Sequence, residues 1–199
     1  MEYQLRLATP EDAPAIRSIY APFVESSPIS FEVDPPTTTE MAERIETTLR
    51  KYPWFVCETD EGEILGYATA SSLRSTPPYA WTAELTVYVA EDAHQSGIGT
   101  ALYTSLLETL EEQGFYNAYA VVTLPNPASV KLHERMGFEP VGTFPAVGYK
   151  QEEWHDIQWW YRQLADHPSD PEPPQPLTAI RGSPELEHIL KRAETYFDR

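Results

Sequence analysis

A strand that runs through a glycine-containing turn into a helix is the feature that most constrains how this chain can fold. Residues 81–89 have the β-propensity of a strand, and residues 98–113 carry apolar side chains at helical spacing before Gly114 ends the helix. Gly97 and Gly99 lie at the junction. The free N–H groups of such a helix start bind phosphate without any Lys or Arg. The alternative is a plain strand-to-helix turn, because the third glycine of a dinucleotide fingerprint and the Lys of a P-loop are both missing.

The rest of the chain supplies strands and helices around this unit. Apolar alternation predicts strands at residues 3–7, 54–59, 64–71, 118–123, 138–144 and 155–164. Capping residues in front of apolar residues at helical spacing predict helices that begin at Pro10 and span 39–51 and 127–136. The order β, α, α, β, β, β, α, β, α, β, β predicts a mixed α/β sheet with helices packed against it.

The C-terminal part of the chain differs in composition from the rest. Residues 166–177 are rich in proline, which predicts an extended linker between a domain of residues 1–165 and an extension of residues 178–199. Ser183 and Pro184 begin a helix in this extension, with apolar residues on one face. A short helix is not stable alone, so it must dock on the body of the protein or on a second subunit.

Charge and composition exclude several functions. The chain of 199 residues has 31 acidic against 14 basic residues, a formal net charge of −17, and no Lys/Arg cluster that could bind nucleic acid or an anionic membrane. The lone Cys57 excludes an internal disulfide, and no metal site is expected. No apolar run or N-terminal signal directs the chain to a membrane, so we expect a cytoplasmic protein. The acidic surface fits either ordinary solubility or a halophilic, salt-rich host.

Four residues outside the glycine turn are candidates for chemistry. Glu84 lies in the middle of a strand, where desolvation would raise its pKa toward that of a useful general base, although an outward-facing or salt-bridged Glu is the simpler interpretation. Asn126 or Ser129 could cap the helix that follows. His133 on that helix could equally be an ordinary surface histidine.

Taken together, these segments resemble the GNAT superfamily of acetyl-CoA-dependent N-acetyltransferases, and within it the phosphinothricin N-acetyltransferase family. The resemblance spans about residues 3 to 165 and leaves out the linker and the last helix. It rests on the glycine turn and on the motifs Tyr52-Pro53-Trp54, Tyr79-Ala80-Trp81-Thr82-Ala83-Glu84, Val87-Tyr88-Val89, Leu124-Pro125-Asn126 and Trp154-His155-Asp156. It implies a mostly antiparallel central sheet flanked by helices. Members of the family also imply a homodimer, to which the C-terminal helix could contribute a clasp.

The resemblance also implies a role for each matching residue. Glu84 falls on the general base, and His133 falls where the family places a residue that assists the departing thiolate. Cofactor contacts fall on Val87, Tyr88, Val89, His94, Gln95, Ser96, Gly97, Ile98, Gly99, Thr100, Asn126 and Ser129. Phe31, Arg74, Tyr79 and Trp81 are the candidates for the acceptor pocket.

Two positions depart from the family pattern. His94 replaces the usual Gln or Arg at the start of the cofactor loop, which predicts a retained but altered contact with CoA. Thr76 stands near the place of an Arg found in herbicide-acetylating members, which weakens the case for a phosphinate acceptor, although Arg74 could pair with a carboxylate.

The function predicted from the sequence is direct acetyl transfer from acetyl-CoA to the primary amine of a small amino-acid-like molecule. Two alternatives stay open at this point. One is an N-acetyltransferase that acts on peptides or proteins, and the other is a non-catalytic module that binds acyl-CoA.

Overall fold

The computed structural model describes residues 3–94 and 96–197. The strands are β1 (Tyr3–Leu7), β2 (Trp54–Thr59), β3 (Ile64–Ser72), β4 (Thr82–Val89), β5 (Asn117–Leu124), β6 (Glu139–Lys150) and β7 (Glu153–Gln163). The helices are α1 (Ala13–Glu25), α2 (Thr38–Thr48), α3 (Ile98–Glu112), α4 (Pro127–Arg135), α5 (Leu177–Ile180) and α6 (Pro184–Ala193). Short 3-10 turns lie at Pro10–Asp12, Pro77–Tyr79, Glu91–Ala93 and Glu194–Tyr196.

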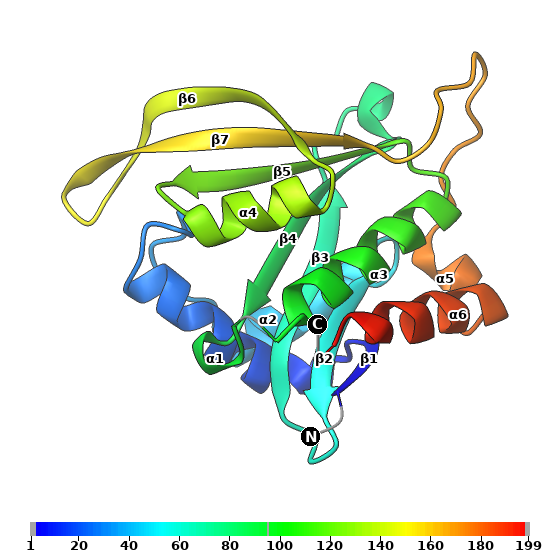
Figure 1. Ribbon diagram of the computed structural model, residues 1–199, viewed down its shortest axis with the longest axis horizontal. Coiled ribbons are helices and arrows are strands. Elements are labelled where there is room, and N and C mark those ends of the chain that lie inside the picture. The colour runs from blue at the N-terminus through cyan, green and yellow to red at the C-terminus, as the bar shows by residue number, and fades with distance from the viewer. Residues whose placement is uncertain (1–2, 95, 198–199) are drawn as a thin grey trace.

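The described strands form one sheet in the order β1-β2-β3-β4-β5-β7-β6 (Figure 1). Every pair in it is antiparallel except β4 with β5, which run parallel because α3 connects them. The predicted mixed and mostly antiparallel sheet is therefore confirmed. The strand, glycine turn and helix that constrain the fold lie at its centre, as β4 and α3.

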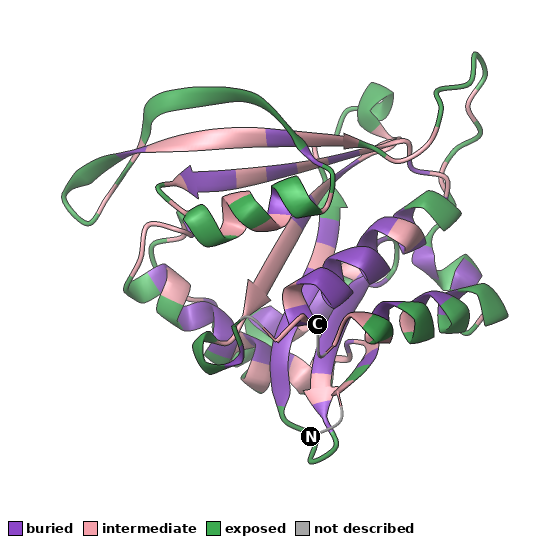
Figure 2. Cartoon of the chain, in the orientation of Figure 1, coloured by how far each residue is buried: buried purple, intermediate pink, exposed green. Residues whose placement is uncertain are grey.

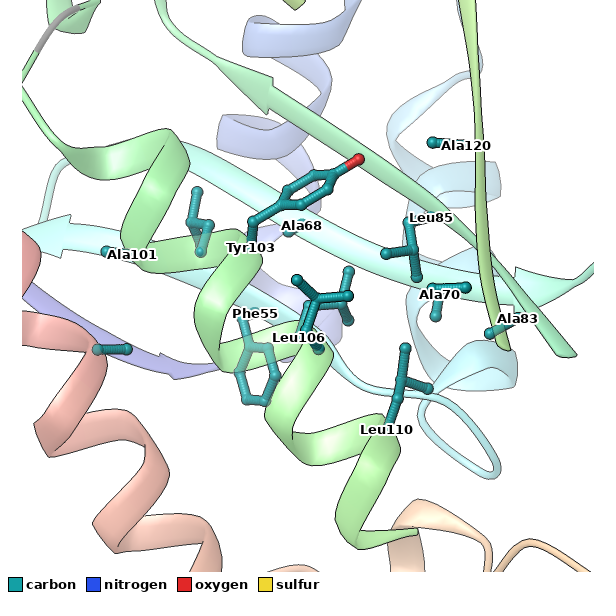
Figure 3. Packing of buried hydrophobic residues seen from close by; sticks show 14 of the residues in the cluster. Phe55, Ala68, Ala70, Ala83, Leu85, Ala101, Tyr103, Leu106, Leu110 and Ala120 are labelled. Carbon is teal, nitrogen blue, oxygen red and sulfur yellow. The ribbon is translucent and has the colours of Figure 1, made fainter. Parts of the chain in front are cut away.

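Helices cover both faces of the sheet. Side chains alternate along a strand, so Phe55 and Val56 of β2 belong to two different buried clusters. Phe55 packs with Leu106 and Leu110 of α3, as Figure 3 shows, whereas Val56 packs on the side of α1 and α2. The centre of the sheet is therefore buried on both faces (Figure 2).

The last two strands are longer than predicted. The sequence indicated strands at 138–144 and 155–164, whereas β6 and β7 form a hairpin that continues through residues 145–154. Most of β6 is exposed (Figure 2), so no alternation of buried and exposed residues marks its second half. Gln151 and Glu152 at the turn both have positive φ, which the sequence did not indicate because neither is Gly or Asn.

The C-terminal extension docks on the body of the same chain. The side chain of Ser183 caps α6, as predicted, and accepts a hydrogen bond from the N–H of Leu186 at 3.2 Å. The apolar face of α6 is buried against α3 and β1, with Ile189 at 5% exposure and Ala193 at 0%. Leu177, expected at the end of the linker, instead begins α5 and is fully buried. The stripe proposed as an intersubunit clasp is therefore used within the chain.

Candidate active site

The two central strands begin side by side and then part. β4 and β5 are paired from Thr82 with Asn117 to Leu85 with Ala120, and the pairing ends there. Figure 1 shows the strands diverging beyond this point, while β4 stays paired with β3 and β5 with β7. The peptide groups of β4 that face β5 past Leu85 therefore have no strand partner. Apart from the carbonyl oxygen of Val89, which lies 3.1 Å from His94 Nε2, these groups can bind an extended ligand that lies between the strands.

The register decides which peptide groups face this opening. The N–H of Ala90 donates to the carbonyl oxygen of Leu65 at 2.8 Å, which places the peptide groups of Tyr88 toward β3. Those of Val87 and Val89 consequently face the opening. The ring of Tyr88 packs against the core cluster beneath α1 and α2. Of the predicted strand contacts, the structure brings Val87 and Val89 to the opening and keeps the peptide groups of Tyr88 away from it.

Gly97 and Gly99 lie at the start of α3, and a glycine is present at each position for a different structural reason. Gly97 has a φ of 85°, and a Cβ there would lie 2.1 Å from the carbonyl oxygen of Tyr196, so only glycine fits. A Cβ at Gly99 would meet only side-chain atoms of Leu132 at 3.6 Å and Val89 at 3.8 Å, which is ordinary contact. Internal packing therefore does not require a glycine at 99. An external group that approaches the backbone would require one.

The rest of the loop presents donors to the same place. The N–H of Ala101 bonds to the carbonyl of Gly97 at 2.9 Å and begins the helical ladder, so the N–H groups of residues 98–100 precede it and have no helical acceptor. His94 Nε2 lies 3.1 Å from the carbonyl oxygen of Val89, which ties the loop to β4. Ser96 Oγ donates to the carbonyl of Ala93 at 2.6 Å. Gln95 lies outside the described residues.

Glu84 lies on β4 just before the two strands part. It is paired with Ser71 of β3 and Tyr119 of β5, and it is half-buried. No hydrogen bond holds its carboxylate among the residues that the structure describes. Burial raises the pKa of Glu84 above its ordinary value, and the positive charge of Arg74 lowers it to a smaller extent. The carboxylate is thus desolvated and available to accept a proton.

His133 is buried on α4, with 3% of its surface exposed. Its Nδ1 lies 2.7 Å from the carbonyl oxygen of Ser129, and its Nε2 lies 2.8 Å from the hydroxyl of Tyr103 on α3. A carbonyl oxygen only accepts, so Nδ1 carries the proton and Nε2 accepts from the Tyr103 hydroxyl. The ring stacks on Trp160 with centroids 5.8 Å apart. Burial lowers the pKa of His133, so the imidazole is neutral.

Tyr103 was not singled out by the sequence. It is 1% exposed, and burial raises the pKa of its hydroxyl well above the ordinary value. Figure 3 shows its ring reaching from α3 toward the strands, with the hydroxyl at the far end. The ring belongs to the same cluster as Leu85 and Ala120, the last pair before β4 and β5 part. The only available signal was an aromatic hydroxyl on the buried face of the helix.

Asn126 and Ser129 form the start of α4. The side-chain oxygen of Asn126 accepts a hydrogen bond from the N–H of Ser129 at 3.1 Å, so Asn126 is the N-cap. Ser129 Oγ lies 3.4 Å from His133 Nδ1. The prediction that Asn126 caps the helix is therefore confirmed. Any contact with CoA would use the side-chain amide nitrogen, which takes no part in the cap.

The four acceptor candidates are spread over several elements. The ring of Phe31 lies against Gly148 of β6, where a Cβ would come within 2.2 Å of it. Arg74 is exposed and its charge acts on Glu84. Tyr79 is 43% exposed. The indole N–H of Trp81 donates to the carbonyl of Glu172 in the linker at 2.8 Å, so that group is not available to an acceptor.

The remaining cysteine has no place in this site. Cys57 lies fully buried in β2, and burial raises its pKa to about 12. A thiol of that pKa is not a nucleophile near neutral pH. Within residues 3–94 and 96–197, no helix is both long and apolar enough to cross a membrane.

A parting pair of parallel strands, with unpaired peptide groups and a helix start rich in N–H donors beside it, suits an extended ligand that carries a phosphate. The chain belongs to the family described as the acetyltransferase (GNAT) domain, whose model matches residues 5–159. It is an acetyl-CoA-dependent N-acetyltransferase of the GNAT type, with acetyl-CoA as its co-substrate.

Two relatives and one solved structure show which GNAT acetyltransferases this chain resembles. Phosphinothricin N-acetyltransferase of Streptomyces viridochromogenes is 40% identical over 177 residues, which cover 89% of this chain and 96% of that protein. The L-methionine sulfoximine/L-methionine sulfone acetyltransferase of Pseudomonas aeruginosa is 32% identical over 82% of this chain and 96% of its own length. A crystal structure of a phosphinothricin acetyltransferase from Sinorhizobium meliloti in complex with acetyl-CoA matches with a TM-score of 0.81 and 33% identity, covering 87% of this chain and 94% of that one.

Proposed function

We propose that this protein transfers the acetyl group of acetyl-CoA directly to the primary amine of a small amino-acid-like molecule, with Glu84 as general base. The observation that carries the proposal is a half-buried carboxylate without a hydrogen-bond partner in the described structure, one pair before β4 and β5 part. The relatives named above support an acceptor of this kind, since phosphinothricin and methionine sulfoximine are both amino acids.

The chemistry begins with the acceptor. An amine arrives mostly as an ammonium ion, which has no lone pair for attack, so Glu84 removes one proton directly or through a water. Acetyl-CoA supplies the thioester: the N–C bond forms as the C–S bond breaks, the sulfur leaves with the electron pair, and the second proton of the nitrogen passes to that sulfur or to water. Val87 and Val89 offer peptide N–H groups on the opening, where they stabilise the negative charge on the carbonyl oxygen.

His133 is proposed to assist the leaving thiolate together with Tyr103. Because Nδ1 donates to Ser129 and Nε2 accepts from Tyr103, the neutral ring has no further proton to give. Tyr103 holds the one hydroxyl proton of the pair, and this proton would turn from His133 Nε2 to a thiolate that forms nearby. His133 then acts as a positioning residue, which fixes the Tyr103 hydroxyl before the thiolate forms.

The cofactor contacts are proposed along the loop and the two helix starts. The N–H groups of residues 98–100 bind the pyrophosphate, because the dipole of α3 and its free donors favour an anion. Gly99 leaves the backbone open to it. Ser96, His94 and Gln95 frame the loop, and the amide nitrogen of Asn126 is free to contact the pantetheine arm from the α4 side.

Arg74 is proposed to bind the carboxylate of the acceptor. It is exposed, its charge already reaches Glu84, and no acidic side chain among the described residues pairs with it. An acceptor whose carboxylate lies on Arg74 would present its α-amine toward Glu84. Tyr79 and Phe31 are the apolar walls proposed for its side chain.

A panel of amines with a thiol-release readout tests the function. Amino acids with a free α-amine should stimulate CoA release from acetyl-CoA, and the N-acetylated products should be found by mass spectrometry. Release with peptides but not with free amino acids would favour the peptide N-acetyltransferase. Binding of acetyl-CoA without any amine-dependent release would leave only the binding module.

A second copy of this chain is proposed to cover the exposed hairpin. Its apolar side chains are between 48% and 65% exposed, namely Val141, Phe144, Val147, Tyr149 and Trp154. Residues 140–149 contain no charged residue, in a chain of net charge −17. Two such acidic molecules can approach only where charge is absent. Phe144→Glu should convert a dimer to a monomer by mass measurement in solution, whereas Val33→Glu at an exposed loop should not.

A further inference from the structure

The part of the chain that follows the family match packs, near its last described residues, against the proposed cofactor loop. α6 lies along α3, and Arg192 forms an ion pair with Glu108 of α3 at 2.5 Å. Figure 1 shows the last described turn of the chain beside the start of α3. This last turn, residues 194–197, is called the C-terminal turn below. It lies far outside residues 5–159 and so is not part of the matched domain.

Two contacts and a buried neighbouring residue hold the C-terminal turn in place. The Glu194 carboxylate accepts a hydrogen bond from the N–H of Leu5 at 2.9 Å, which occupies a donor of the edge strand β1. The ring of Phe197 packs edge-on against Tyr3, with centroids 5.2 Å apart. Ala193, the residue that precedes the turn, is fully buried. The turn is therefore fixed on β1 and cannot swing freely from α6.

The C-terminal turn touches the loop at its tightest point. The carbonyl oxygen of Tyr196 lies so close to Gly97 that a Cβ there would be only 2.1 Å away, and the Cα of Phe197 would be 3.4 Å away. Gly97 is the left-handed residue from which α3 begins. The backbone of the C-terminal turn thus packs directly against Gly97 at the start of α3.

Tyr196 also lines a cleft that runs from this point along α3. The cleft has a volume of about 860 Å³, and its walls include Thr100 and Thr104 on one side and Arg135 and Arg162 on the other. Glu108 and Glu139 line it as well. Glu108 is paired with Arg192, whereas Arg135 has no ion-pair partner among the described residues. One end of the cleft is Gly97, next to the donors proposed to bind the pyrophosphate.

We propose that the C-terminal turn is part of the acetyl-CoA site: it holds the Gly97 turn in its binding conformation, and Tyr196 forms one wall of the cleft that receives the nucleotide end of the cofactor. The inference rests on the proposed phosphate site at residues 97–100. A nucleotide whose pyrophosphate lies on those donors has Gly97 and the mouth of the cleft beside it, and Arg135 on the wall of the same cleft supplies a cation for a terminal phosphate.

The expected effect is on binding of the cofactor and not on the acceptor. Without the C-terminal turn, the loop must be ordered when acetyl-CoA binds, and the conformational entropy lost on ordering it weakens binding. We therefore expect the Kd for acetyl-CoA to rise about tenfold when residues 194–199 are removed. Tyr196→Ala keeps the backbone contact and removes the wall, so a smaller rise of about threefold is expected.

Titration calorimetry with acetyl-CoA measures these constants without any turnover. Thr195→Ala is the matched control, because Thr195 is exposed on the same turn and its hydroxyl donates to the carbonyl of Arg192 within the turn's own approach from α6. It should leave the Kd unchanged. S-acetylpantetheine, which lacks the nucleotide, provides a second control, and its kcat/KM should be the same for the full chain and for Tyr196→Ala.

Each other outcome has a defined meaning. Tighter binding of acetyl-CoA after truncation would show that the turn occludes the site, which overturns the proposal. An unchanged Kd in both the truncated chain and Tyr196→Ala would also overturn it. Should the truncated chain unfold, Tyr196→Ala alone decides. If Gly99→Ala also leaves the Kd unchanged, the phosphate site itself has failed, whereas a loss with Gly99→Ala alone rejects only the role of the C-terminal turn.

Discussion

Gly99→Ala should make the protein more stable and bind acetyl-CoA less well. Gly99 is in the first turn of α3, and a Cβ there makes only ordinary contacts with Leu132 and Val89. Replacing a helical glycine by alanine stabilises the fold by about 0.5–1 kcal/mol. In a chain of this size that raises the Tm by roughly 1–4 °C. The same methyl group would stand where we place the pyrophosphate, so the Kd for acetyl-CoA should rise about tenfold, or about 1.4 kcal/mol.

Gly97→Ala is the matched comparison. Alanine in the left-handed conformation costs about 1–2 kcal/mol, and the 2.1 Å approach to Tyr196 adds a steric cost. Both variants should weaken binding, but Gly97→Ala should lower the Tm while Gly99→Ala raises it. Thermal unfolding and calorimetry on the three proteins separate the two effects. Wild-type affinity in a stabilised Gly99→Ala would refute the idea that position 99 must be glycine for the ligand to approach the backbone.

Further predictions concern the catalytic groups. Tyr103→Phe should lower kcat at least tenfold with little change in the Kd for acetyl-CoA, and should destabilise the fold by about 1–3 kcal/mol because His133 Nε2 loses its buried donor; an unchanged kcat would remove Tyr103 from the mechanism. Arg74→Ala should raise the KM for the amino acid and move the acidic limb of the pH profile to higher pH, because the charge of Arg74 lowers the pKa of Glu84; a limb that stays in place would mean that Glu84 is not the group titrating. Cys57→Ala should leave kcat unchanged, since its pKa of about 12 keeps the thiol protonated; a loss of kcat without a loss of Tm would speak against this.

The sequence was most informative where local patterns and global fold agree. The alternation along β4, the two glycines and the helical spacing of α3 are each local signals, and they predicted the centre of the sheet and the proposed cofactor loop. Glu84 was singled out because a carboxylate in the middle of a strand should be partly desolvated, and the resemblance to the family added its role as a base. The structure shows Glu84 half-buried, as that argument predicts.

Other features depend on contacts between distant segments. The partner of His133 is Tyr103, 30 residues away, and no pattern in either helix indicates the pair. The carbonyl of Tyr196 that closes on Gly97 belongs to a backbone, so its side chain carries no signal at all. The second half of β6 was missed because it is exposed along most of its length, which removes the alternation by which strands are identified.

The Glu84→Gln variant tests the central claim most directly, because activity and stability should move in opposite directions. A glutamine cannot take the proton of the ammonium, so kcat should fall about 10²–10⁴-fold while the Kd for acetyl-CoA stays the same. A raised carboxyl pKa means that the folded state binds more protons than the unfolded state, so the ionised Glu84 destabilises the fold as pH rises above its ordinary value of 4.5.

Glu84→Gln should therefore be more stable than the wild type at neutral pH, and this gain should vanish below about pH 4.5. Single-turnover acetylation and thermal unfolding, measured on the same two proteins across that pH range, give both quantities. A variant that is more stable, binds acetyl-CoA normally and no longer acetylates an amine is the predicted result. Turnover near the wild-type rate would contradict the assignment of Glu84 as the general base.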